Sequence, residues 1–212
     1  MSKNKTPLIT IIITIAVVLG LGYLLYKSSP KNQPQTAVVD DMHGGSYGAP
    51  ITKQLNSLVG KTLPDIQLSD KDGKTYTAAD FKGKYTVFFF NEGLMCYPAC
   101  WNQIAAFGSD ERMNSDQIQA ISVVVDSAKD WQRAIDKMPP LAKANTMFDA
   151  GAMASQRLGM LTTASSMHRG SLPGHTYLLI DKEGIVRYVF DDPNMAIAND
   201  VLFIKINELE KQ

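Results

Sequence analysis

The stretch TVFFFNEGLMCYPACW, residues 86–101, carries both the fold signal and the chemistry of this chain. It opens with Thr86–Asn91, a continuous apolar run typical of strands that are buried on both faces of a sheet. The two cysteines of the chain, Cys96 and Cys100, follow closely and lead into a helix that we predict over Trp101–Phe107. Proteins of the α/β class place reactive groups where a strand feeds a helix N-terminus. The pattern therefore predicts a cysteine site at this edge of a sheet.

Strands and helices alternate along the rest of this part of the chain. Further apolar runs predict strands at Gln119–Asp126, Thr176–Asp181 and Ile185–Phe190. Further helices are predicted at Ser127–Lys137, Ala152–Leu158 and Ala196–Leu209. A turn that ends in Gly184 joins the last two strands, so we expect them to form an antiparallel hairpin. This order predicts a three-layer α/β domain with a central mixed β-sheet flanked by helices.

The spacing of the cysteines bears on whether they can form a disulfide. Positions i and i+4 of a helix hold their Cβ atoms about 5–6 Å apart, whereas a disulfide requires roughly 3.5–4.5 Å. A Cys96–Cys100 bond therefore requires Cys96 to lie outside regular helix or the first turn to distort, and Pro98 suits either arrangement. We expect a disulfide that forms and is easily reduced. The alternatives are a structural disulfide and two inert buried thiols, although a bond that closes so short a loop stabilises a fold little.

The composition excludes several classes of protein. Lys and Arg together number 21, as do Asp and Glu, and this zero net charge argues against a nucleic-acid partner. Two cysteines in 212 residues exclude a disulfide-rich scaffold and a four-cysteine zinc site. With 45% hydrophobic and 20% charged residues, the chain has enough apolar surface to bury a core.

The N-terminal part of the chain differs from the rest. Residues 8–26, LITIIITIAVVLGLGYLLY, contain no charged side chain, and a helix of that length spans roughly 28 Å, close to the bilayer hydrocarbon thickness of about 30 Å. We expect a single transmembrane helix in the cell membrane rather than a cleaved signal peptide, because no A-x-A-like site follows. Residues 1–7 then form a tail, 27–50 a flexible linker and 51–212 the folded domain, which we expect on the extracytoplasmic side.

Two segments of the domain resemble a known family. LVGKTLPDIQLSDKDGKTYTAADFKGKYTVFFF, residues 58–90, is similar to the opening of the redoxin group, and GHTYLLIDKEGIVRYVF, residues 174–190, is similar to its closing hairpin. That group comprises the alkyl hydroperoxide reductase/thiol-specific antioxidant (AhpC/TSA) peroxiredoxins and the thioredoxin-like disulfide oxidoreductases. The resemblance implies a thioredoxin-like fold with Cys96 and Cys100 at the active-site position.

The cysteine spacing departs from both branches of the group. Peroxiredoxins carry P-x-x-x-T-x-x-C after this strand, and with Asn91 at the proline position the threonine and cysteine would fall at Met95 and Pro98. Their catalytic arginine lies just before a later strand, where this chain has His175. Thioredoxins use C-x-x-C, whereas this chain has C-x-x-x-C. The resemblance therefore implies thiol chemistry and leaves peroxides and protein disulfides both open as substrates, with a thiol reductant protein as partner.

We therefore expect an oxidoreductase with antioxidant activity and no cofactor. Its two cysteines are expected to have separate roles. Cys96 lies nearer to the strand and is expected to be the more exposed, so we expect its thiolate to attack the substrate, and the nearby helix N-terminus favours the thiolate. Cys100, one turn later, would resolve the mixed disulfide. His175, at the start of a strand in this fold, is expected to tune a thiol or move a proton. Glu92 is a further candidate for proton transfer.

Two alternatives to this enzyme stay open. The C-x-x-x-C spacing also resembles copper-binding proteins of cytochrome oxidase assembly, which share the fold and add a histidine before the same strand. Two soft thiolates and an imidazole suit Cu(I), so Cys96, Cys100 and His175 would form the site of a chaperone-like protein without turnover. His168, in the stretch SSMHRGS, is a weaker candidate. A non-catalytic anchored domain would require both thiols to be inert.

Overall fold

A computed structural model describes residues 52–211, which is the predicted domain without its terminal residues. The predicted tail at 1–7, transmembrane helix at 8–26 and linker at 27–50 lie outside the described residues. Between residues 52 and 211, no helix is both long and apolar enough to cross a membrane.

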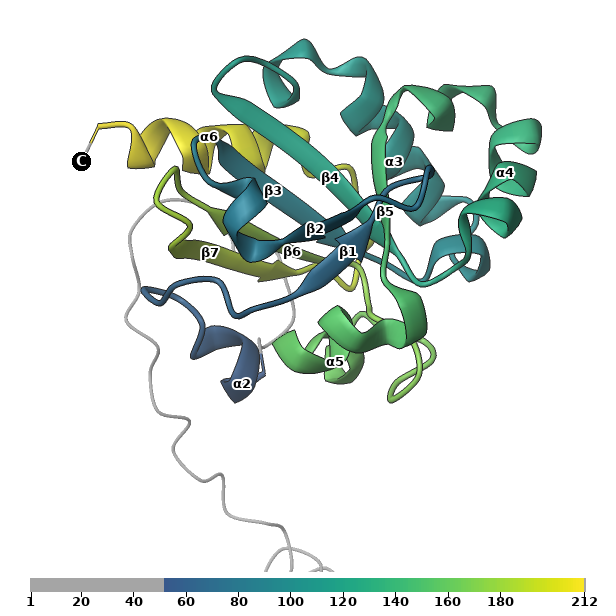
Figure 1. Ribbon diagram of the computed structural model, residues 1–212, viewed down its shortest axis with the longest axis horizontal. Helices are drawn as coiled ribbons and strands as arrows, with labels where there is room; N and C mark the ends of the chain where they lie inside the picture. Colours follow the sequence, from purple (N-terminus) through teal and green to yellow (C-terminus); the bar gives the residue numbers. More distant parts are fainter. Residues whose placement is uncertain (1–51, 212) are drawn as a thin grey trace, which may run out of the picture. The chain divides into compact units, whose positions relative to one another are not determined.

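The described residues form a seven-stranded sheet that mixes parallel and antiparallel pairs (Figure 1). In their order across the sheet, the strands are β2 (Thr75–Thr77), β1 (Gln67–Ser69), β5 (Asn145–Phe148), β4 (Ile118–Val124), β3 (Tyr85–Phe90), β6 (Thr176–Ile180) and β7 (Val186–Asp191). β3 pairs with β4 in parallel and with β6 in antiparallel orientation. The predicted mixed sheet is therefore confirmed, with the strand that leads to the cysteines inside it.

Helices cover both faces of this sheet and complete the three predicted layers (Figure 1). The helices on one face are α3 (Ala99–Ser109), α4 (Ala128–Lys137) and α6 (Asn199–Leu209). Those on the other face are α2 (Lys53–Asn56) and α5 (Met153–Leu158). Short 3₁₀ helices lie at Ala78–Phe81, Gly93–Met95, Glu111–Met113, Pro139–Lys143, Ala150–Ala152 and Met160–Thr162.

The strand β3 is buried along its whole length because helices cover it from both sides. Val87 and Phe89 pack into the hydrophobic cluster that contains side chains of α3, α4 and α6. Phe88 and Phe90 belong to the opposite cluster, with side chains of α2 and α5. Side chains of a strand alternate between its two faces, so a strand covered on both faces needs an unbroken apolar run, which is what the sequence shows.

The long predicted elements are all present, with small changes at their ends. Ser127 caps α4 as expected, because its hydroxyl accepts a hydrogen bond from the Asp130 N–H at 3.1 Å. α5 ends at Gly159, whose φ of 79° lies in the left-handed region that glycine adopts freely. Gly184 closes the predicted hairpin between β6 and β7 with a φ of 83°.

Three short strands and the start of the last helix differ from the sequence-based expectation. β1, β2 and β5 contain three, three and four residues and include exposed side chains, so no two-residue period is long enough to recognise. α6 begins at Asn199 rather than at the predicted Ala196. The reason is that the Asp192 carboxylate accepts hydrogen bonds from the N–H groups of Asn194 and Ala196, both at 2.9 Å, and holds them in a turn.

Candidate active site

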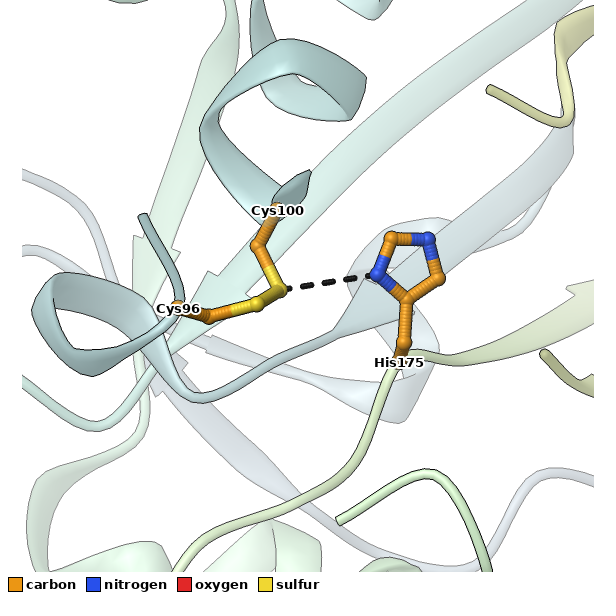
Figure 2. A group of neighbouring side chains, drawn as sticks. All are labelled: Cys96, Cys100 and His175. Atoms are coloured by element: carbon orange, nitrogen blue, oxygen red, sulfur yellow. Dashed lines mark hydrogen bonds between the residues drawn. A yellow bond between two sulfur atoms is a disulfide. The ribbon is translucent and has the colours of Figure 1, made fainter. Parts of the chain in front are cut away.

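Cys96 and Cys100 form a disulfide where the chain passes from β3 to α3 (Figure 2). After β3 the chain makes one 3₁₀ turn, Gly93–Met95, and Cys96 ends that turn outside any α-helix. Pro98 directly precedes α3, and Cys100 lies in the first turn of this helix, with its N–H donating to the Cys96 carbonyl at 3.0 Å. The Cα atoms of the two cysteines are 5.4 Å apart, within the range of a disulfide. Cys96 therefore lies outside regular helix, which is one of the two arrangements that the spacing allows for a disulfide.

Both cysteines are enclosed by the protein in the disulfide form. Cys96 is 2% exposed and Cys100 is 0% exposed, so Cys96 is the more accessible by a very small margin. The Cys96 side chain turns inward to reach Cys100, and the neighbouring side chains of Met95 and Tyr97 point into solvent instead. In the disulfide form both sulfurs are therefore shielded from bulk solvent.

His175 lies directly before β6 and brings an imidazole to the disulfide (Figure 2). Its Nδ1 atom is 3.5 Å from the Cys100 sulfur, and its ring packs against Phe89 with ring centroids 4.5 Å apart. The side chain is fully buried, and this burial lowers the pKa of His175 to about 4, so the ring is neutral at pH 7. The structure thus brings Cys96, Cys100 and His175 together, with a neutral imidazole beside the second cysteine.

Two further polar side chains, Tyr177 and Gln103, continue from His175 into the core. The His175 Nε2 atom lies 2.8 Å from the Tyr177 hydroxyl oxygen, and Tyr177 donates a hydrogen bond to Gln103 Oε1 at 3.0 Å. Burial raises the pKa of Tyr177 well above its ordinary value, so the hydroxyl keeps its proton. The only sequence signal for Tyr177 is its place two residues after His175, which puts both side chains on one face of an extended segment. Gln103 comes from α3 and carries no such signal.

Glu92, the candidate for proton transfer, holds a loop instead of approaching a cysteine. Its side chain is buried, and its Oε1 atom accepts hydrogen bonds from the N–H groups of Met167 at 2.6 Å and His168 at 3.0 Å. Its Oε2 atom lies 3.0 Å from His168 Nδ1. Both carboxylate oxygens are therefore engaged by the loop around Met167. His168 is exposed and pairs with Glu92, so the structure does not place it with Cys96 and Cys100.

The turn between β3 and Cys96 depends on Gly93. Its φ of 57° lies in the left-handed region, and its carbonyl accepts a hydrogen bond from the Trp101 indole N–H at 3.1 Å. The next N–H, that of Leu94, donates to Asp126 Oδ2 at 3.0 Å. A Cβ atom at position 93 would overlap this carboxylate. Glycine is therefore needed here for both its backbone conformation and the close approach of Asp126.

Gly93→Ala is expected to destabilise the fold by about 2–4 kcal/mol, because it adds steric overlap to the cost of a left-handed backbone. Gly73→Ala is the matched control, since Gly73 has a φ of 83° but no atom near the position of a Cβ. The control should lose only the backbone contribution of about 1–2 kcal/mol. Urea unfolding of both variants measures the difference. Equal losses would contradict the close approach of Gly93 and Asp126.

An open cavity of about 630 Å³ adjoins the segment between the two cysteines. Tyr97 and Pro98 form part of its wall, and α4 contributes two cations, Arg133 and Lys137. The remaining lining side chains are Leu94, Trp101, Asn102 and Met138. The cavity therefore places an apolar, positively charged surface beside the disulfide segment.

The three central side chains also meet the geometric requirement for a metal site. The sulfur atoms of Cys96 and Cys100 and a ring nitrogen of His175 all lie within 4.8 Å of one another. Thiolates bind soft metals, whereas a disulfide offers no thiolate. These side chains could therefore hold an ion such as Cu(I) only after the disulfide is reduced.

Comparison with protein families and curated proteins points to peroxiredoxins. The profile of the AhpC/TSA family matches residues 59–189. A chloroplastic peroxiredoxin Q from Triticum aestivum is 30% identical over 139 residues, which cover 63% of this chain and 58% of that protein. A chloroplastic peroxiredoxin Q from Gentiana triflora is 27% identical over 195 residues, 88% of this chain and 80% of that protein. This chain thus spans less than two thirds of the length of the Triticum relative.

Several solved structures share this arrangement of strands and helices. AhpC from Enterococcus faecalis aligns with a TM-score of 0.61 and 16% identity over 72% of this chain and 92% of that one. A peroxiredoxin-like protein from Aquifex aeolicus aligns with a TM-score of 0.58 and 19% identity over 77% of this chain and 91% of that one. At these identities the likeness concerns the fold, and it confirms the predicted thioredoxin-like architecture.

Proposed function

Because the chain belongs to the AhpC/TSA family, we propose that it is a thiol oxidoreductase that reduces a peroxide or a protein disulfide through Cys96 and Cys100. The observation that carries this proposal is the disulfide at the end of an inner strand, with a buried neutral imidazole 3.5 Å from one sulfur. A disulfide that closes so short a loop contributes little to stability, which favours a redox role over a structural one. The electrons come from sulfur, so the reaction requires no resident cofactor.

In the proposed peroxidase cycle, the Cys96 thiolate attacks the peroxide and breaks its O–O bond. One oxygen leaves as an alcohol or water after it takes up a proton, and Cys96 becomes a sulfenic acid. The Cys100 sulfur then attacks the Cys96 sulfur, water is lost and the disulfide forms. A thiol reductant protein returns both cysteines to thiols. With a protein disulfide as substrate, Cys96 forms a mixed disulfide that Cys100 resolves, so both reactions end in the same bond.

The cavity beside the disulfide supports an approach from the side of Tyr97 and Pro98. Arg133 and Lys137 make this wall positive, although Arg133 also lies 3.7 Å from Asp130. Positive charge around an open site raises the local concentration of anionic partners. We therefore expect the substrate, or the contacting surface of the reductant, to carry negative charge.

A thiol titration of the purified, fully reduced chain tests the proposal. Separate samples receive hydrogen peroxide in modest excess, insulin as a protein disulfide, or Cu(I), and the remaining thiols are counted over time. A peroxidase should lose both thiols quickly with peroxide, and its mass should fall by two hydrogens. A disulfide oxidoreductase should react slowly with peroxide and fast with insulin.

The same titration examines the Cu(I) alternative, which the 4.8 Å spacing of Cys96, Cys100 and His175 favours specifically. A copper carrier should bind one Cu(I) per chain, protect both thiols from titration and lose the ion in His175→Ala. Binding of Cu(I) without any reaction with peroxide or insulin would replace the proposed enzyme with a carrier. Thiols that respond to none of the three reagents would contradict both functions.

A further inference from the structure

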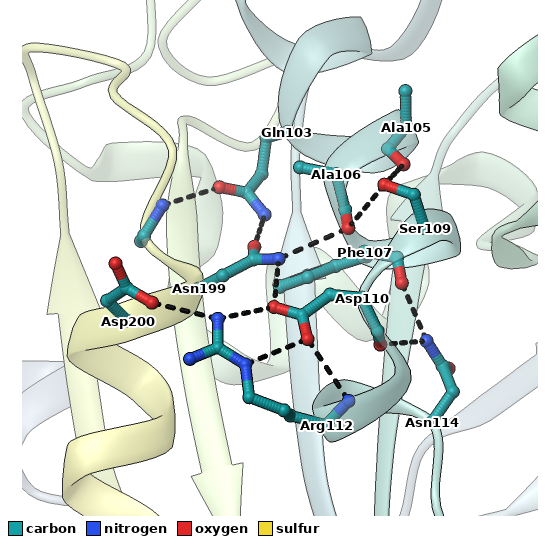
Figure 3. Close-up of polar contacts among 11 residues, drawn as sticks. Gln103, Ala105, Ala106, Phe107, Ser109, Asp110, Arg112, Asn114, Asn199 and Asp200 are labelled. Carbon is teal, nitrogen blue, oxygen red and sulfur yellow. Dashed lines mark hydrogen bonds and ion pairs between the residues drawn. The ribbon is translucent and has the colours of Figure 1, made fainter.

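A chain of hydrogen bonds leads from α3 and α6 to the Tyr177 hydroxyl beside His175. Figure 3 shows its outer end, where Asn199 contacts Gln103 and Asp110. The side-chain amide of Asn199 donates to the Ala106 carbonyl at 3.1 Å and to the Asp110 carboxylate at 3.0 Å. Hydrogen bonds from the Arg112 side chain lower the pKa of Asp110 to about 2, so at neutral pH this group only accepts. Asn199 must therefore turn its NH₂ group outward and its oxygen toward Gln103.

Gln103 is fixed in direction from two sides. Its Nε2 atom donates to the Asn199 oxygen at 2.9 Å, and its Oε1 atom accepts from the Ala198 N–H at 2.7 Å. A backbone N–H can only donate, so both contacts agree on which end of the Gln103 amide is oxygen. The Tyr177 hydroxyl lies 3.0 Å from that same oxygen and must therefore donate its proton to it.

The Tyr177 hydroxyl in turn decides which nitrogen of His175 carries the proton. Its one hydrogen points at Gln103, so its lone pairs face His175 and accept from the Nε2–H at 2.8 Å. A neutral imidazole has one N–H, and the Nδ1 atom therefore directs a lone pair at the Cys100 sulfur, 3.5 Å away. The opposite tautomer would leave the oxygens of Tyr177 and Gln103 facing each other without a hydrogen, which is costly in a buried place.

We propose that Tyr177 and Gln103 are positioning residues that hold His175 in the Nε2–H tautomer. In this tautomer Nδ1 accepts the thiol proton of Cys100 as the disulfide closes, an inference that rests on the proposed peroxidase function. The Cys100 S–H bond breaks, and its sulfur forms the S–S bond with the sulfenic sulfur of Cys96. The S–O bond of the sulfenic acid breaks at the same time. The departing hydroxide takes the proton from Nδ1 as water, so His175 ends neutral.

The tautomer is measurable by NMR in the full chain labelled with ¹⁵N-histidine. The chain has three histidines, so the variants His43→Gln and His168→Gln assign the remaining ring signals to His175. Long-range ¹H–¹⁵N correlations distinguish the tautomers, and we expect the Nε2–H form in both the reduced and the disulfide state. Tyr177→Phe removes the hydroxyl that accepts the hydrogen bond from Nε2–H, so a population of the Nδ1–H form should appear. An unsubstituted chain with the proton on Nδ1 of His175 would overturn the inference.

Stopped-flow oxidation of the full chain tests the catalytic part. Tyr177→Phe should slow disulfide closure by about tenfold or more, while formation of the sulfenic acid, followed with a sulfenic-acid trap, stays unchanged. Tyr188→Phe makes the same chemical change on β7, outside the chain of hydrogen bonds, and should alter neither step. Unchanged closure in Tyr177→Phe, or equal slowing of both steps, would contradict a positioning role.

These measurements also separate the inference from the proposed function. If peroxide oxidises neither cysteine, the proposed peroxidase and the closing step both fail. If peroxide forms the disulfide at the same rate whichever tautomer His175 adopts, only the inference fails, and the peroxidase stands. The NMR measurement needs no turnover, so its result holds in either case.

Discussion

Cys96→Ser is expected to abolish reduction of the substrate, with a loss of at least about three orders of magnitude in rate. A serine hydroxyl is neither a comparable nucleophile at neutral pH nor able to store the two electrons of the cycle. Cys100→Ser should behave differently, because the first attack does not use Cys100. In this variant, one equivalent of peroxide should convert Cys96 to a sulfenic acid that persists and reacts with a trapping reagent. Mass spectrometry of the trapped product identifies the oxidised residue.

Folding controls separate lost chemistry from lost structure in these two variants. The disulfide closes a loop with a sequence separation of only four residues, so its removal should cost at most roughly 2 kcal/mol of unfolding free energy. Urea unfolding of the reduced parent chain and of both serine variants should therefore give similar midpoints. If Cys100→Ser loses the first oxidation step and Cys96→Ser retains it, the two roles are reversed. The thiol beside His175 would then be the one that attacks.

The fold could be predicted where a short stretch of sequence decides the structure. β3 and β4 lie inside the sheet, and every strand from β3 to β7 except β5 gives an apolar run that is visible without knowledge of its partners. β1, β2 and β5 are too short and too exposed for such a signal. Their pairing depends on segments that lie far apart in the sequence, such as Ser69 and Phe148, and only the folded chain brings these together.

The residues of the candidate site likewise differ in whether the sequence alone reveals them. Cys96 and Cys100 are found from the strand that precedes them, and His175 is found from its place at the start of a later strand. Gln103 could not be found, because its partners Ala198 and Asn199 lie more than 90 positions further along the chain. Gln103 contacts these residues only in the folded chain, where the start of α6 packs beside α3. A buried glutamine on an otherwise apolar helix face is the one weak signal that the sequence offers.

Acid is expected to weaken the fold through His175, by up to about 3 kcal/mol of unfolding free energy between pH 7 and pH 4. Burial lowers the pKa of His175 from its ordinary value of 6.5 to about 4. Between these values the unfolded chain binds a proton that the folded chain does not. The contribution of His175 to the free energy of unfolding is therefore fully present above pH 6.5, and it is lost as the pH falls toward the pKa of His175 in the folded chain. Urea unfolding at pH 7.0 and pH 4.5 measures the loss.

Other groups titrate near this range, so the comparison needs variants. Burial raises the pKa of Asp126, which opposes the effect of His175 because a carboxyl group with a raised pKa stabilises the folded chain on acidification. His175→Gln keeps an N–H donor for Tyr177 but cannot titrate, and it should lose most of the difference between the two pH values even if its stability at pH 7 is lower. His43→Gln, which replaces a histidine outside the described residues, is the matched control and should retain more of the difference. If His175→Gln and the parent chain weaken equally on acidification, the buried neutral imidazole beside Cys100 is not the group that the folded chain protects from protonation.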